Sequence, residues 1–175
     1  AYTVDKKACI GCGRCATACP AGAVVFGPEE TTTRILDAGS IVLAPGFEKF
    51  DPTSLKEFGY GTYPNVITSI ELERMLNASG PTKGHVLRPS DGRIPKKAAF
   101  VQCVGSRFGK PKERYCSAVC CMLSVKEALI SQEHTPGLKT TIFFMDLRAF
   151  GKDFDEYYKR AESEYGVRFV MWRPS

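Results

Sequence analysis

The chain has 175 residues, of which 43% are hydrophobic and 25% are charged. These proportions are ordinary for a globular protein, and the length suits one compact domain or two small ones. No apolar run is long enough to span a membrane and no basic-then-apolar leader is present, so we expect a cytoplasmic protein without a transmembrane segment. The net charge is +5, but the basic residues are dispersed and form no recognition motif, so we expect no nucleic-acid partner.

The first segment, residues 1–28, carries four of the eight cysteines. They follow the spacing C-x2-C-x2-C-x3-C-P, which is the spacing of bacterial ferredoxins, and are Cys9, Cys12, Cys15 and Cys19. Gly11 and Gly13 allow the backbone to wrap closely around a bound group, and strand-like residues flank the run at 2–5 and 23–26. The run predicts a [4Fe-4S] cluster.

The spacing leaves the role of Cys19 open. In two-cluster ferredoxins the fourth cysteine of such a run ligates the other cluster, and only one run is present here. Cys19 therefore either completes the local cluster or ligates a cluster outside this chain. Cys9, Cys12 and Cys15 are the three ligands that the spacing predicts in both cases.

Residues 29–95 predict a strand pair, a loop and a helix. Residues 31–36 are β-prone, and residues 40–44 form a short continuous apolar run, as in a strand that is buried on both faces. A long loop follows over 47–66. Thr68 and Glu71 form a capping-box pattern that predicts the start of a helix, and residues 77–81 end it.

Residues 96–175 predict a β-α-β unit with an additional helix and strand. The predicted strands are 98–102, 140–145 and 167–172, and a helix is predicted over 117–133. A second helix is predicted after Asp153, which would cap it together with Glu156.

The other four cysteines lie at the junction of the first of these strands and the helix after it. They are Cys103, Cys116, Cys120 and Cys121. Cys103 follows the strand, where α/β folds bind ligands, and Cys120 and Cys121 can reach one cluster only near a helix end. Cys116 would share a face with Cys120 if the helix began that early. The alternative is that Cys120 and Cys121 are ordinary buried core thiols.

Several motifs of the chain resemble HdrA, the iron–sulfur flavoprotein of heterodisulfide reductase, and the related flavoproteins of sulfate reducers. They lie at residues 63–74, 80–81, 101–107, 115–122 and 143–152. The resemblance implies that Cys103, Cys116, Cys120 and Cys121 hold a second, flavin-proximal cluster. It also implies that Ala44, Pro45 and Gly46 form a turn near FAD, although Pro45 stands where that class usually has Thr.

The resemblance implies an α/β fold in three parts. Residues 1–28 would be a ferredoxin-type iron–sulfur segment, and residues 29–95 the return strands, loop and helix of an FAD domain. Residues 96–175 would be a β-α-β domain with the second cluster site. The last two would be part of a thioredoxin-reductase-like, Rossmann-type flavoprotein fold. No G-x-G-x-x-G motif follows a strand here, so we expect an interior or split portion of a longer protein.

The function that the resemblance implies is electron transfer within an oxidoreductase complex. Electrons would pass between FAD and partner subunits through two [4Fe-4S] clusters, with flavin-based bifurcation as a family-level implication. The partners would be other subunits of a heterodisulfide-reductase-like complex and a hydrogenase or another electron-donor subunit. No residue has the setting of a catalytic nucleophile or general base. The alternatives are a free ferredoxin-like carrier without flavin and a zinc-stabilised interaction module.

Overall fold

The computed structural model describes residues 5, 7–26, 31–107 and 114–172. The chain divides into two compact units, Ala1–Gly46 and Phe47–Ser175. The three-part division at residues 28 and 95 stays a prediction.

The first unit contains one short helix, α1 (Arg14–Ala18), within the cysteine run. Gly13 precedes this helix in the left-handed conformation, with a φ of 71°, as expected for a glycine at a tight turn. Residues 23–26 are not in a strand, so that prediction is wrong. The prediction for residues 2–5 lies largely outside the described residues.

The predicted strand pair at 31–36 and 40–44 is also wrong, because the structure has neither helix nor strand between residues 31 and 50. Ile41, Val42 and Leu43, which the pattern places in a buried strand, are 81–89% exposed. A strand needs a neighbouring strand for its backbone N–H and C=O groups. The described part of the chain provides no such neighbour for these residues.

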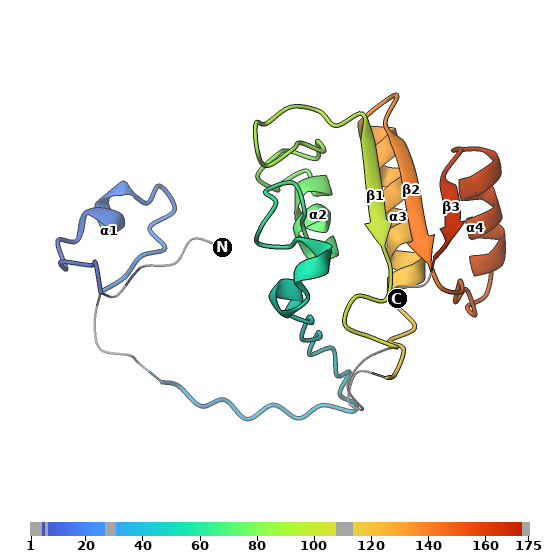
Figure 1. Ribbon diagram of the computed structural model, residues 1–175. Coiled ribbons are helices and arrows are strands. Elements are labelled where there is room, and N and C mark those ends of the chain that lie inside the picture. The colour runs from blue at the N-terminus through green and yellow to red at the C-terminus, as the bar shows by residue number, and fades with distance from the viewer. Residues whose placement is uncertain (1–4, 6, 27–30, 108–113, 173–175) are drawn as a thin grey trace. The chain divides into compact units, whose positions relative to one another are not determined.

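The second unit is built on a three-stranded parallel sheet in the order β1-β2-β3. The strands are β1 (Lys97–Val101), β2 (Lys139–Phe144) and β3 (Arg168–Met171). Helix α3 (Cys120–His134) connects β1 to β2, and α4 (Phe154–Ser163) connects β2 to β3. Figure 1 shows α3 against the β1–β2 part of the sheet and α4 beside β3. The predicted β-α-β unit is confirmed.

The core of this unit lies between α3 and the sheet. Val125 and Ala128 of α3 and Ile142 of β2 are completely buried, and Ala161 of α4 and Val167 close the same cluster. The residues of α3 that line this core recur at spacings of three and four, as on one face of a helix. Burial of this face fixes the position of α3, and therefore of its first residues.

Helix α2 (Ser69–Leu76) packs against α3 through Leu72 and Leu76. Its predicted capping box is present. The Thr68 side chain accepts from the Glu71 backbone N–H, and the Glu71 carboxylate accepts from the Thr68 backbone N–H at 2.7 Å. The predicted loop before α2 contains two short 3-10 helices, Pro52–Ser54 and Lys56–Phe58.

The start of α4 differs from its prediction. The helix begins after Asp153, but Asp153 has a φ of 64° and its side chain makes no capping hydrogen bond. A residue with positive φ cannot direct its carboxylate at the first-turn N–H groups as an extended N-cap residue does. The capping pattern of Asp153 and Glu156 therefore predicts where the helix starts but not how it is capped.

The sequence predicts no transmembrane segment, and the helices of the structure bear on this prediction. Within residues 5–172, apart from the gaps named above, none of the helices combines the length and the apolar character that crossing a bilayer requires.

The capping box generates a stability prediction. Thr68→Ala should lower the free energy of unfolding by about 1 kcal/mol, because it removes the acceptor for a helix N–H group. Urea unfolding of the full chain, followed by circular dichroism under anaerobic, reducing conditions, measures this change. Thr33→Ala, at an exposed position without secondary structure, is the matched control and should leave the midpoint unchanged. Equal midpoints for both variants would contradict the assignment.

Candidate metal centres

The first group of thiols lies on the surface of the first unit. Cys9, Cys12 and Cys15 are exposed and Cys19 is half-buried, and all four are free thiols. Gly11 has a φ of 69°, so the tight turn expected between the first two cysteines is present. This arrangement keeps the thiols accessible on a short, closely turned loop.

Cys19 differs from the other three cysteines in its surroundings. Its sulfur accepts a hydrogen bond from the backbone N–H of Ala23 at 3.4 Å. This bond, together with the N–H of Ala21, lowers the pKa of the Cys19 thiol because both stabilise the thiolate. The surroundings of Cys19 therefore favour its thiolate form more than an unperturbed thiol would.

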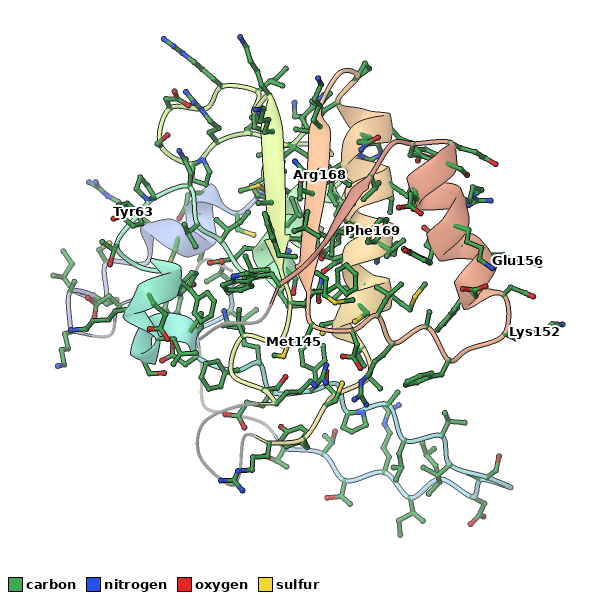
Figure 2. All side chains as sticks on the ribbon, turned by 45° about the vertical axis from the view of Figure 1, so that its right-hand side comes forward. Tyr63, Met145, Lys152, Glu156, Arg168 and Phe169 are labelled. Atoms are coloured by element: carbon green, nitrogen blue, oxygen red, sulfur yellow. The ribbon has the colours of Figure 1, made fainter. Side chains whose placement is uncertain are left out.

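The second group of thiols is positioned by β1 and α3. Cys103 lies two residues beyond the end of β1, and Cys120 and Cys121 are the first two residues of α3. The strand and the helix are consecutive in the β-α-β unit, so the end of one lies close to the start of the other. Some of the yellow sulfur atoms in Figure 2 lie at this end of the sheet, near the labelled Met145.

Cys116 lies outside the helix, so the expectation that it shares a helical face with Cys120 is wrong. Ala118 has a φ of 57°, which is incompatible with a continuous right-handed helix through residues 116–120. Cys116 is half-buried four residues before the helix, and its sulfur accepts a hydrogen bond from the backbone N–H of Ala118 at 3.3 Å.

Backbone strain is concentrated around these thiols. Cys103, Arg107 and Ala118 all have positive φ values between 57° and 70°, although none is glycine. Each such conformation costs on the order of 1 kcal/mol and persists only where the surroundings enforce it.

The thiols of Cys103, Cys120 and Cys121 act on one another's proton affinity. The contact with Cys120, followed by burial, raises the pKa of the Cys103 thiol. The contact with Cys103 lowers the pKa of Cys120, but its contact with Cys121 and burial outweigh this and raise it. The pKa of Cys121 is lowered to about 7, chiefly by its contact with the Cys120 thiol. Cys103 and Cys121 are almost fully buried, at 5% and 3% exposure.

Among the described residues, the first backbone N–H groups of α3 have no intrahelical and no side-chain capping acceptor, and they lie next to Cys120 and Cys121. The N–H groups of the first turn of a helix have no intrahelical acceptor, and Val119 does not cap them with its side chain. The first intrahelical bond runs from the N–H of Leu123 to the carbonyl of Val119, at 3.1 Å. The partial positive charge at this helix end favours a bound anion.

Asp146, which the sequence did not predict as part of the site, lies on the loop after β2. It pairs with Arg107, and Nε of Arg148 lies 3.5 Å from its carboxylate. The Cys121 thiol donates to the backbone carbonyl of Asp146 at 3.9 Å, and the Arg148 N–H lowers the pKa of this thiol. The loop after β2 therefore forms part of the wall around Cys121, and Arg107 ties the loop after β1 to it. The sequence signal for this was the position of Asp146 two residues beyond β2, at the same sheet edge as Cys103.

The residues of this second group fit an iron–sulfur cluster in their donor chemistry. The thiols of Cys103, Cys120 and Cys121 act on one another, Cys116 lies four residues before the helix, and Arg107 acts on Cys103. Gln102 is buried, and its Nε2 has no hydrogen-bond partner among the described residues. Within those residues, no three His, Cys, Asp or Glu side chains surround a position for a single metal ion. A four-iron cluster is held by four cysteine thiolates, and this group contains four cysteines.

Comparison with known families defines the class of protein. A family model described as a 4Fe-4S binding domain matches residues 2–25, which contain the whole first cysteine run. The chain therefore has the sequence of an iron–sulfur protein, as the spacing predicts.

Curated relatives define the protein family more narrowly. The chain is 47% identical over 99% of its length to HdrA, the CoB–CoM heterodisulfide reductase iron–sulfur protein, of Methanocaldococcus jannaschii. It is 49% identical over 98% of its length to the corresponding component of the H2/formate:CoB–CoM heterodisulfide,ferredoxin reductase of Methanococcus maripaludis. It is 47% identical over 95% of its length to that of the ferredoxin/F420H2-dependent CoB–CoM heterodisulfide reductase of Methanosarcina acetivorans. The chain is similar over nearly its whole length to a portion of the HdrA proteins of heterodisulfide reductases, and the resemblance predicted from the motifs is confirmed.

The chain spans only part of these relatives. It covers 26% of the M. jannaschii protein, 33% of the M. maripaludis protein and 21% of the M. acetivorans protein. The activity, substrates and partners of those complete proteins therefore apply to this chain only as proposals.

The ion pairs of Asp146 generate a prediction about the second unit. Asp146→Asn should lower the free energy of unfolding by about 1 kcal/mol, because two partly buried arginines lose their shared carboxylate. Urea unfolding monitored by the fluorescence of Trp172 measures the change. Asp155→Asn, which breaks the exposed Asp155–Lys159 pair of α4, is the control and should have no measurable effect. An equal effect of the two substitutions would show that Asp146 is only a surface charge.

Proposed function

We propose that this chain is an electron-transfer module of a heterodisulfide-reductase-like complex. The observation that carries the proposal is the meeting of Cys103, Cys120 and Cys121 at one edge of a parallel sheet, with Cys116 nearby. A ferredoxin-type run in the same chain supplies a second, separate set of thiols. A [4Fe-4S] cluster held by four thiolates supplies reversible one-electron transfer.

In this proposal each group of residues has a defined task. Cys103, Cys116, Cys120 and Cys121 hold one cluster, and the free N–H groups of α3 donate to it. Arg107 supplies positive charge at Cys103 and is held in place by Asp146. Cys9, Cys12 and Cys15 hold the other cluster, with Cys19 as its fourth ligand or as a ligand for a cluster beyond this chain.

The flavin is a further part of the proposal. We assign Ala44, Pro45 and Gly46 to a turn near FAD in the complete protein, whose flavoprotein part would have a Rossmann-type fold. Gly46 has a φ of 78°, which is consistent with a tight turn at this position. The exposed apolar side chains of Ile41, Val42 and Leu43 suit a segment that is covered by further parts of that protein.

The similarity to HdrA proteins also suggests partners and a location. We propose other subunits of a heterodisulfide-reductase-like complex as partners, with a hydrogenase or another electron-donor subunit upstream. A cytoplasmic location is supported by the eight free cysteines, because clustered thiols persist in a reducing compartment.

Selective loss of one cluster tests this assignment. Cys120→Ser should remove one electron paramagnetic resonance signal of the reduced, anaerobically prepared chain and leave the other unchanged. Cys15→Ser should do the reverse, because the two sets of ligands do not overlap. Survival of both signals in Cys120→Ser would refute the second site. A flavin-free chain with two normal clusters that exchanges electrons with soluble donors and binds no other subunits would favour the free-carrier alternative.

A further inference from the structure

A polar stripe runs along α3 through the interior of the second unit. It begins at Cys120 and continues with Ser124, Glu127 and Ser131, at spacings of four, three and four residues, so the four side chains share one helical face. Ser124, Glu127 and Ser131 are buried, and Glu127 has 0% exposure. A fully buried carboxyl group is rare unless it is paired.

Glu127 is not paired. Both of its carboxyl oxygens lack a hydrogen-bond partner among the described residues, and so does the Ser131 hydroxyl one turn further along the helix. The charged form of an isolated carboxylate is costly to bury, so the protonated form is favoured. Burial raises the pKa of Glu127 to about 8.

The charged neighbours of Glu127 come from two helices. Glu73 of α2 raises its pKa further, and Lys126 beside it on α3 lowers it. Lys126 is bound to Glu73 at 2.9 Å, so its charge is largely neutralised by that carboxylate. Among the described residues these are the charges that act on Glu127, since the sheet side of α3 packs on apolar residues such as Ile142.

Glu127 lies close enough to the second group of thiols to sense its charge. Seven residues separate it from Cys120, which corresponds to about 10 Å along the helix axis. At an effective dielectric constant of about 20, one added charge at this distance changes the proton affinity of a carboxylate by roughly tenfold. The interior position of the stripe excludes the ions that would screen the interaction.

We propose that Glu127 is a redox-linked proton-binding site of the second cluster. When the Cys103–Cys121 site gains one electron from a one-electron iron–sulfur donor, the Glu127 carboxylate gains one proton from solvent, and oxidation releases both. No other bond forms or breaks. The inference rests on the proposed function, because it requires a cluster at these cysteines.

The linkage has a defined sign. The added electron makes the site more negative and raises the proton affinity of Glu127, and by reciprocity a bound proton makes reduction easier. A tenfold coupling corresponds to about 59 mV in the midpoint potential of a one-electron couple. The potential should therefore be higher when Glu127 is protonated and should fall as the pH rises through the interval in which it ionises, which begins near pH 8.

The test is a redox titration of the anaerobic full chain from about pH 6 to about pH 10, with electron paramagnetic resonance as the readout. For the wild type, the midpoint potential of the signal that is lost in Cys120→Ser should fall by about 59 mV across this range. Glu127→Gln should make that potential independent of pH, because glutamine does not titrate. Glu133→Gln on the same helix, at an exposed position, is the matched control and should retain the wild-type slope.

A second readout does not need a cluster. The infrared carbonyl stretch of a protonated, buried carboxyl group should be present at pH 7 in the wild type, disappear as the pH rises, and be absent in Glu127→Gln. Identical pH dependence of the potential in wild type and Glu127→Gln would overturn the inference while leaving the cluster assignment intact. Absence of the second signal in the wild type would overturn the proposed function, and with it the redox link, even if the infrared band titrates.

Discussion

The second site depends on one constraint, which is the packing of α3 against the parallel strands it connects. Burial of Val125 and Ala128 against Ile142 fixes the helix on the sheet. The start of the helix must then lie at the edge where β1 ends. Cys103 and the pair Cys120–Cys121 are brought together by this geometry, although 17 and 18 residues separate them in the sequence. Cys103 and Ala118, on either side of this connection, both have positive φ values.

Electrostatics at this edge are arranged for negative charge. The free N–H groups of α3, the Arg107 guanidinium and the Arg148 backbone N–H all approach the thiols, while Asp146 holds the two arginines from behind. Further along the same helix, the surroundings disfavour negative charge. Glu127 is enclosed without a donor and is thereby kept protonated near neutral pH. Helix α3 thus carries the thiols, whose surroundings stabilise negative charge, at its start, and Glu127, whose proton affinity responds to that charge, further along.

The sequence predicted those parts of the fold that depend on local patterns. The three strands and the helices α3 and α4 of the second unit follow from hydrophobic periodicity, and the capping box of Thr68 and Glu71 at the start of α2 follows from its residue types. The strand pair at 31–44 was not predictable in the same way. Its apolar residues carry the pattern of a strand, but a strand forms only where another strand is available to pair with it.

For the candidate cluster site, too, the sequence shows what depends on local spacing but not what depends on contacts formed on folding. The cysteines themselves could be identified from spacing and from resemblance. Asp146 and Glu127 could not, because their roles depend on which atoms lie next to them after folding. A glutamate on a helix is ordinarily a surface residue, and only the position of α2 over α3 shows that Glu127 is buried.

The measurement that tests this account most directly is the metal and sulfide content of the anaerobically purified chain. Two [4Fe-4S] clusters predict about eight iron atoms and about eight acid-labile sulfides per chain, with no stoichiometric zinc. Half of these values would leave only the ferredoxin-type run as a cluster site. Stoichiometric zinc without sulfide would contradict the electron-transfer account and favour a zinc-stabilised interaction module.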